Sequence, residues 1–213
     1  IYWKNPGDSG LPTDIKFSLP YGITSSEIKF PIPKIFTSDE IVNYGYDHQV
    51  LLLSELFIPK DYKQKEIFIS AKLISLICKE LCKSFDTTVT IRLDLSKDFL
   101  AETKVSDLFE LTKNSLPQVT HNLKTSVVSK SDSVYLKVSG DETKNTSSLK
   151  FFFYSSGVFK NSINQNVIKK ENYFELILEP DPFGVKNPTE VKGIILLNDD
   201  HTKAYEINIP ITN

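Results

Sequence analysis

Cys78 and Cys82 are the only two cysteines of the 213-residue chain, and three residues separate them. Two thiols at this spacing can form a disulfide that opens and closes, bind a metal ion, or lie in the core as small apolar groups. In a helical turn, positions i and i+4 share one face with Cα atoms about 6 Å apart, within reach of a disulfide. A tight strand–turn–strand also brings them together, and the strand-like flanks favour this second arrangement.

The spacing alone does not separate redox or metal chemistry from a structural role. A disulfide across so short a loop removes little entropy from the unfolded chain, so it would be a weak structural staple. Lys79 and Lys83 would favour the reactive thiolate if they pointed toward the sulfurs. A redox pair and a staple therefore both stay open at this point.

A metal site is a third reading of the same cysteines. Cys78, Cys82 and His48 could together hold Cu(I) or Zn, because thiolates and imidazole suit these ions. His121 and His201 are the other histidines, and no HExxH or CxxC motif accompanies them. We expect no metal and no other cofactor, since a phosphate-binding glycine loop and a dinucleotide fingerprint are also missing from the sequence.

Strand signals surround the cysteines on both sides. Runs of apolar, β-branched and aromatic residues predict strands at 27–30, 48–56, 66–77, 87–95, 133–138, 149–154, 173–178, 191–197 and 204–209. In the run 87–95, Val89, Ile91, Leu93 and Leu95 alternate with polar residues, which predicts one buried face and one wet face. Many short strands separated by turns predict an all-β, mainly antiparallel protein built as sandwiches.

One segment has helical rather than strand periodicity. Val105, Leu108, Phe109 and Thr112 recur at helical spacing, with Ser106 as the predicted N-cap. Pro117 disfavours helical geometry at the residue before it, so the helix is expected to end near Leu116. We place the domain boundary after it, with one domain over 1–117 and a second over 125–213, joined by the helix and a short polar linker.

Composition excludes several classes of function. The hydrophobic fraction is 40% and the charged fraction 24%, which is ordinary for a globular protein. The net charge of −2 comes from interspersed lysines and acids, so we expect no nucleic-acid partner. The longest apolar runs are too short to cross a bilayer. The chain begins at Ile1 without a leader, and we expect a fragment or processed form whose contact with a membrane runs only through missing regions.

Several motifs around the cysteines resemble a known family. Residues 2–12 read YWKNPGDSGLP, and residues 19–22 and 28–33 read LPYG and IKFPIP. Residues 43–46 read NYGY, and residues 76–82 read LICKELC. In this order the motifs resemble the periplasmic N-terminal (alpha) region of DsbD/ScsB-type thiol:disulfide interchange proteins. The resemblance spans nearly the whole chain, and the first eighty residues carry most of its specificity.

The resemblance implies two immunoglobulin-like β-sandwich domains and a redox role for the first. Cys78 and Cys82 would then be the exchanging pair of a protein-disulfide reductase module. Such a module accepts electrons from a thioredoxin-like domain and a transmembrane domain of the same or a partner protein, and it reduces periplasmic thioredoxin-fold proteins. The implied location is the periplasm of a Gram-negative bacterium, as part of an inner-membrane protein. The alternative is a non-catalytic immunoglobulin-like binding module with a structural disulfide.

The resemblance also implies a lid over the cysteines. Tyr44 and Gly45 resemble the tip of a loop that covers the active site in this family, and Tyr46 is as plausible a cover as Tyr44. An aromatic lid would exclude wrong oxidants and move when a partner docks. The chain departs from the family in having no aromatic residue just before the first cysteine and no proline soon after the second. The N-terminal strand or strands expected before Tyr2 are also missing from this sequence.

Overall fold

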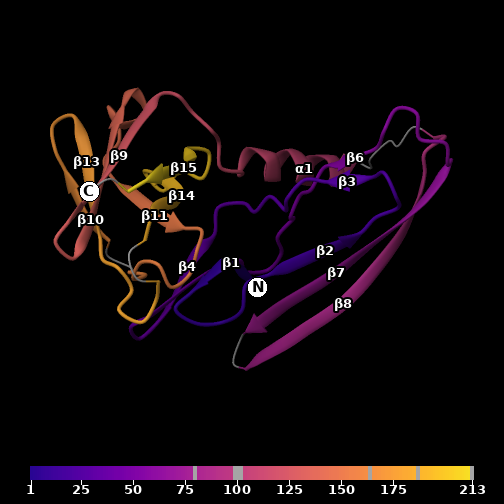
Figure 1. Ribbon diagram of the computed structural model, residues 1–213, viewed down its shortest axis with the longest axis horizontal. Coiled ribbons are helices and arrows are strands. Elements are labelled where there is room, and N and C mark those ends of the chain that lie inside the picture. The colour runs from indigo at the N-terminus through magenta and orange to yellow at the C-terminus, as the bar shows by residue number, and fades with distance from the viewer. Residues whose placement is uncertain (79–80, 98–102, 163–164, 186–187, 212–213) are drawn as a thin grey trace.

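The computed structural model describes residues 1–78, 81–97, 103–162, 165–185 and 188–211. Nearly all its regular structure is antiparallel β-sheet, with one α-helix between the two halves of the chain, so the predicted all-β class is confirmed (Figure 1). The strands of the first half are β1 (Tyr2–Gly7), β2 (Asp14–Ser18), β3 (Thr24–Ser25), β4 (Lys34–Ser38), β5 (Ile41–Gly45), β6 (Leu56–Phe57), β7 (Glu66–Cys78) and β8 (Cys82–Asp94).

The second half follows the helix α1 (Thr103–Asn114). Its strands are β9 (Leu123–Lys130), β10 (Ser133–Gly140), β11 (Leu149–Phe153), β12 (Asn166–Lys169), β13 (Tyr173–Leu178), β14 (Glu190–Leu197) and β15 (Ala204–Pro210), with a 3₁₀ turn η1 (Asp141–Thr143) after β10. The sheet β12-β13-β10-β9 faces the sheet β11-β14-β15 across an apolar core. This part is the predicted antiparallel sandwich.

Strand β14 is buried on both faces, which explains its continuous apolar run. Val191, Ile195 and Leu197 point into the sandwich core. Ile194 and Leu196 point the other way, into a second cluster that they share with residues of the first half. Since neighbouring residues of a strand point to opposite faces, one strand can serve both cores.

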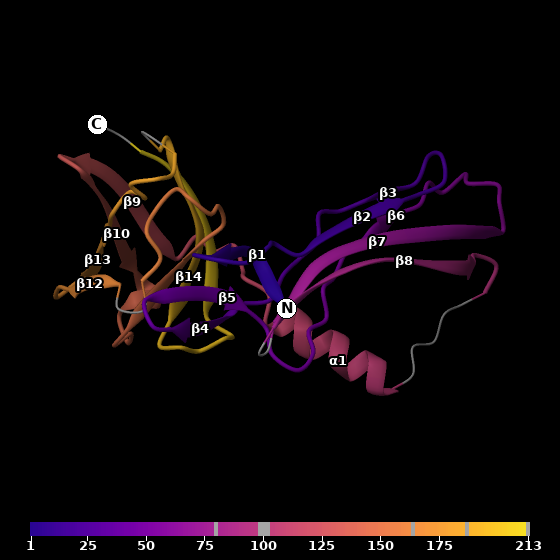
Figure 2. The same cartoon turned by 90° about the horizontal axis from the view of Figure 1, so that it is seen from below.

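The second cluster joins the two halves of the chain. The sheet β1-β5-β4 lies on the outer face of the sheet β11-β14-β15 as a third layer, as Figure 2 shows from below. Trp3 is fully buried at its centre, edge-on to Tyr44 and Phe152. Asn5 adds a buried hydrogen bond, donated by Nδ2 to the Phe153 carbonyl at 2.9 Å.

The rest of the first half extends away from this layer as the sheet β2-β7-β8 beside the short pair β3-β6 (Figures 1 and 2). Ile67, Ile69 and Leu93 contribute to a small third cluster there. The expectation that Val89 and Ile91 are buried is wrong, because they are 57% and 48% exposed. In the described part of the chain β8 is an edge strand of its sheet, and these apolar side chains in its middle are open to solvent.

The predicted helix is confirmed as α1, but its predicted N-cap is wrong. Ser106 lies inside the helix, which begins at Thr103. The helix ends at Asn114, where the Ser115 N–H donates to the carbonyls of Leu111 and Thr112, and the Ser115 carbonyl accepts from the Ile32 N–H. Pro117 then starts an extended linker, in which Gln118 forms a parallel bridge to Tyr205.

Two predicted strands are wrong over most of their length. Residues 27–30 and 48–56 form a single antiparallel bridge, Lys29 to Leu53, and only Leu56 of the second run enters a strand. His48 has a left-handed backbone with φ 59°, which interrupts an extended chain. Val50 and Leu52 pack on the second cluster from an irregular segment, so burial rather than strand pairing accounts for their apolar character.

The division into one domain over 1–117 and a second over 125–213 stays a prediction.

Candidate functional site

Both cysteines lie at one end of the long β7–β8 hairpin. Thirteen residues of β7 pair in antiparallel register with thirteen of β8, from Glu66 opposite Asp94 to Cys78 opposite Cys82. Runs of β-branched and apolar residues favour this pairing on both strands. The expected strand–turn–strand arrangement is therefore confirmed, and the helical turn is excluded.

The register brings the two sulfurs together. The Cα atoms of Cys78 and Cys82 are 4.1 Å apart, and the sulfurs form a disulfide. The hairpin end lies close to the start of the chain in both views (Figures 1 and 2). The pairing of β7 with β8 therefore positions the two sulfurs, and we expect the pairing to persist without the disulfide.

The two cysteines differ in their exposure to solvent. Cys78 is half-buried, whereas Cys82 is exposed. Large apolar side chains around the hairpin end are also open to solvent, with Leu81 79% and Ile77 49% exposed. A partner approaching this end therefore meets Cys82 beside exposed apolar side chains.

The lysines expected to favour a thiolate are not shown to do so. Lys83 follows Cys82 in β8, so its side chain leaves the strand on the opposite face. Lys79 lies outside the residues that the structure describes. The position of Lys83 therefore gives the sulfurs no direct positive neighbour.

Tyr2 is hydrogen-bonded to Cys78. Its hydroxyl donates a hydrogen bond to Cys78 Sγ at 3.4 Å, across 76 positions of sequence. Sequence reasoning did not identify Tyr2 as a site residue, although it opens the motif 2–12. Nothing in the spacing of the two residues indicates that β1 reaches the hairpin end, because only the tertiary fold brings them together.

The residues expected to form a lid lie in and around the core of the third layer. Tyr44 is 1% exposed and packs on Trp3, while Tyr46 donates its hydroxyl to the buried Pro31 carbonyl at 2.6 Å. Burial raises the pKa of both phenols above the ordinary value. Gly45 lies opposite Tyr2 in the β1–β5 pair. A lid would require these residues to leave the core, so the lid over the active site stays a prediction.

The histidines do not gather around the cysteines. Among the described residues, no three His, Cys, Asp or Glu side chains are grouped so that they could hold a metal ion. The side chain of His48 is 89% exposed and lies 3.4 Å from the Asp47 carboxylate. With both thiols oxidised to a disulfide, the predicted set of Cys78, Cys82 and His48 offers no thiolate to a metal.

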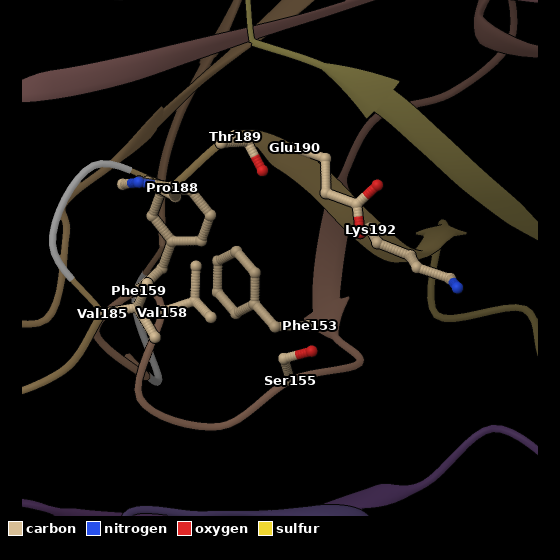
Figure 3. Close-up of a pocket in the computed structure, with 9 residues that line it drawn as sticks. All are labelled: Phe153, Ser155, Val158, Phe159, Val185, Pro188, Thr189, Glu190 and Lys192. Atoms are coloured by element: carbon tan, nitrogen blue, oxygen red, sulfur yellow. The ribbon is translucent and has the colours of Figure 1, made fainter.

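A pocket in the second half offers little chemistry. It has a volume of about 180 Å³ and lies between the end of β11 and the start of β14. Figure 3 shows the stacked rings of Phe153 and Phe159 on its wall, with Glu190 and Lys192 extending away from them. Because its polar groups do not converge, the hairpin end is the better candidate for the functional site.

One similar solved structure is the crystal structure of the N-terminal periplasmic domain of ScsB from Proteus mirabilis. The alignment covers 98% of this chain and 80% of that chain, with a TM-score of 0.64 and 17% sequence identity. The expected resemblance is thus confirmed at the level of fold. No protein-family model matches the chain, and no curated protein does either.

No helix in the described part of the chain is both long and apolar enough to pass through a bilayer.

Proposed function

We propose that this chain is a periplasmic thiol–disulfide exchange module whose redox centre is Cys78 and Cys82. It takes two electrons from a thioredoxin-like or membrane-embedded domain and passes them to the disulfides of periplasmic thioredoxin-fold proteins. The observation that carries the proposal is the disulfide at the end of a long hairpin, where Cys82 is exposed to solvent. The similarity in fold to a periplasmic domain of ScsB supports both the chemistry and the compartment.

We propose an order of reaction from the exposure of the two residues, since Cys82 is exposed and Cys78 is half-buried. The thiolate of a reduced partner attacks Cys82 Sγ, which forms an intermolecular disulfide and releases Cys78 as a thiolate. The partner's second thiolate then attacks the partner's first sulfur, which is bonded to Cys82, and Cys82 leaves as a thiolate. The module ends with two thiols and the partner with one disulfide. In the next exchange Cys82 attacks an oxidised substrate, and Cys78 resolves the mixed disulfide.

The test is electron transfer between purified proteins. We expect the reduced module to reduce an oxidised thioredoxin-fold protein of higher potential, such as DsbA at about −120 mV. The thiols present after the reaction are alkylated and counted from the mass of each protein. Cys78→Ser should stop turnover and trap a mixed disulfide through Cys82, whereas Cys82→Ser should stop turnover without a trapped complex. Normal transfer by either single variant would show that the pair is not the redox centre.

A redox titration separates this function from that of a non-catalytic immunoglobulin-like binding module. Exchange centres of known oxidoreductases have potentials between about −270 and −120 mV, whereas structural disulfides lie below about −300 mV. We expect the Cys78–Cys82 couple to fall in the first range in glutathione or dithiothreitol buffers. A potential below the second limit would favour the binding module.

A further inference from the structure

Tyr2 is held against the redox centre in a way that suggests chemistry rather than packing alone. Its hydroxyl donates to Cys78 Sγ, the half-buried sulfur of the pair. We propose that Tyr2 is a catalytic residue of the exchange reaction, whose hydroxyl stabilises the Cys78 thiolate released when a partner attacks Cys82. This inference rests on the proposed function and adds to it the group that assists the leaving sulfur.

The ring of Tyr2 occupies a space that Gly10 leaves open. A Cβ atom on Gly10 would lie 2.5 Å from two ring carbons of Tyr2, which no real structure tolerates. Gly10 also has a backbone φ of +97°, where glycine is favoured over other residues. The loop after β1 therefore passes over the ring and limits its movement.

The backbone of Tyr2 is tied to the same hairpin as Cys78. Thr13 donates its hydroxyl to the Tyr2 carbonyl at 2.6 Å. The buried Ser75 hydroxyl of β7 lies 3.1 Å from Thr13 Oγ1, and it is the donor because the single proton of Thr13 is already used. Ser75 precedes Cys78 by three residues on β7. This chain of hydroxyls fixes Tyr2 relative to the strand that carries its sulfur partner.

The hydroxyl acts at one defined step. When a partner thiolate bonds to Cys82 Sγ, the Sγ–Sγ bond breaks and its electron pair remains on Cys78 Sγ. A sulfur in a disulfide is a weak acceptor, whereas a thiolate is an anion and accepts a stronger, charge-assisted hydrogen bond. The Tyr2 O–H donates to this anion without giving up its proton. The contact therefore strengthens as the bond breaks, which favours the transition state over the oxidised state.

The same contact makes the reverse step selective. Stabilisation of the Cys78 thiolate raises the fraction of this sulfur that is deprotonated and ready to resolve a mixed disulfide on Cys82. The exposed Cys82 has no such donor among the hydrogen bonds of the described residues. Tyr2 thus accounts for the different roles of the two sulfurs, with Cys82 attacking the substrate and Cys78 resolving the mixed disulfide. The spacing of the cysteines does not show this difference.

The test is Tyr2→Phe, which keeps the ring and removes only the hydroxyl. We expect reduction of the disulfide by dithiothreitol at pH 7 to slow by about one order of magnitude, the size of effect typical for a hydrogen bond to a charged group. In a Cys82→Ser background, the pH dependence of alkylation should show a higher pKa for Cys78 when Tyr2 is replaced. Tyr21→Phe is the matched control, because Tyr21 is fully exposed in a turn and should leave both values unchanged.

The outcomes separate this inference from the proposed function. An unchanged Cys78 pKa and an unchanged reduction rate in Tyr2→Phe would overturn the role of Tyr2, even if the wild-type protein transfers electrons to the oxidised thioredoxin-fold acceptor. A raised pKa and a slower reduction would support it, even if that protein transfer fails, because neither measurement uses a protein partner. Far-UV circular dichroism and a melting curve show that the variant is folded. Gly10→Ala, which displaces the ring, should reproduce the slower reduction.

Discussion

Tyr2 and Gly45 lie directly opposite each other in the antiparallel β1–β5 pair. A Cβ atom on Gly45 would be 2.5 Å from the Ile1 carbonyl oxygen and 3.2 Å from Tyr2 Cα. The absence of a side chain at Gly45 therefore allows the backbone of β5 to support the residue that contacts Cys78. The close approach of the two backbones therefore explains why a glycine stands at position 45, without any role in a lid.

Gly45→Ala tests this support. We expect the free energy of unfolding to fall by about 1–3 kcal/mol, as for overpacking in a core, and reduction by dithiothreitol to slow because Tyr2 is displaced. The control is Gly22→Ala, where a Cβ meets nothing within 4 Å and only the positive φ of 86° is strained. That variant should lose about 1 kcal/mol or less in urea unfolding and keep the wild-type rate of reduction. Wild-type stability and reduction rate in Gly45→Ala would contradict the support of β1 by β5.

The sequence predicted the β class, the helix and the hairpin because these depend on local patterns. Alternation and β-branching mark β7, and the 3.6-residue period marks α1. Strands such as β4 and β5 were missed because turn-forming residues, among them Asn43 and Gly45, lie within or beside them. Their extended form is maintained by packing on β14, which no local pattern encodes.

The candidate site was predictable only in part, for a similar reason. Both cysteines could be identified as candidate site residues from their type and spacing. Tyr2 does not, because its contact with Cys78 depends on the Thr13–Ser75 hydroxyl pair and on the open space at Gly10, which are features of the folded chain. The burial of Tyr44 against Trp3 likewise depends on a layer that forms between distant segments.

Reduction of the disulfide should leave the protein folded. The Cys78–Cys82 loop is short, and the chain-entropy relation gives at most about 2 kcal/mol of stabilisation for it. For a chain of this size we expect the melting temperature to fall by no more than about 8 °C on reduction. Melting curves with and without a phosphine reductant measure this change. The double variant Cys78→Ser, Cys82→Ser serves as the control, since the reductant should not shift its curve, and unfolding of the wild type on reduction would indicate a structural staple.

The acid sensitivity of the sheet at the far end of the hairpin should depend on Asp94. Hydrogen bonds from the Ser96 side chain and backbone, together with Lys97, lower the pKa of this carboxyl to about 2. A lowered folded-state pKa stabilises the fold above the unfolded value of about 4, and this contribution is lost as the pH falls toward 2. Urea unfolding at pH 5 and pH 2 should therefore show a smaller loss of stability in Asp94→Asn than in wild type.

A matched variant identifies the cause of that acid effect. Ser96→Ala removes the largest contribution to the lowered pKa of Asp94 but keeps the backbone donor and Lys97. Its acid sensitivity should lie between those of wild type and Asp94→Asn. Equal losses of stability in all three proteins would mean that Asp94 does not contribute to acid unfolding.

The two halves of the chain should unfold together, and Trp3 is a natural probe of the layer between them. It is the only tryptophan, it is fully buried, and its ring lies edge-on to Phe152 of β11. Because the cluster around Trp3 draws residues from both halves, loss of either half exposes it. We therefore expect its fluorescence transition in urea to coincide with the transition in far-UV circular dichroism, as in two-state unfolding. Separate transitions would mean that the halves unfold independently.

The hydrogen bond from Asn5 to the Phe153 carbonyl should strengthen this coupling. It is buried, so Asn5→Ala removes a donor from a carbonyl that lies away from water. We expect a loss of about 1–3 kcal/mol in the free energy of unfolding, read from Trp3 fluorescence in urea. Asn122→Ala is the control, because Asn122 donates to Glu142 at the surface and its loss should change stability by about 0.5 kcal/mol or less. Equal midpoints for the two variants would show that the layer is held by apolar packing, with no net contribution from Asn5.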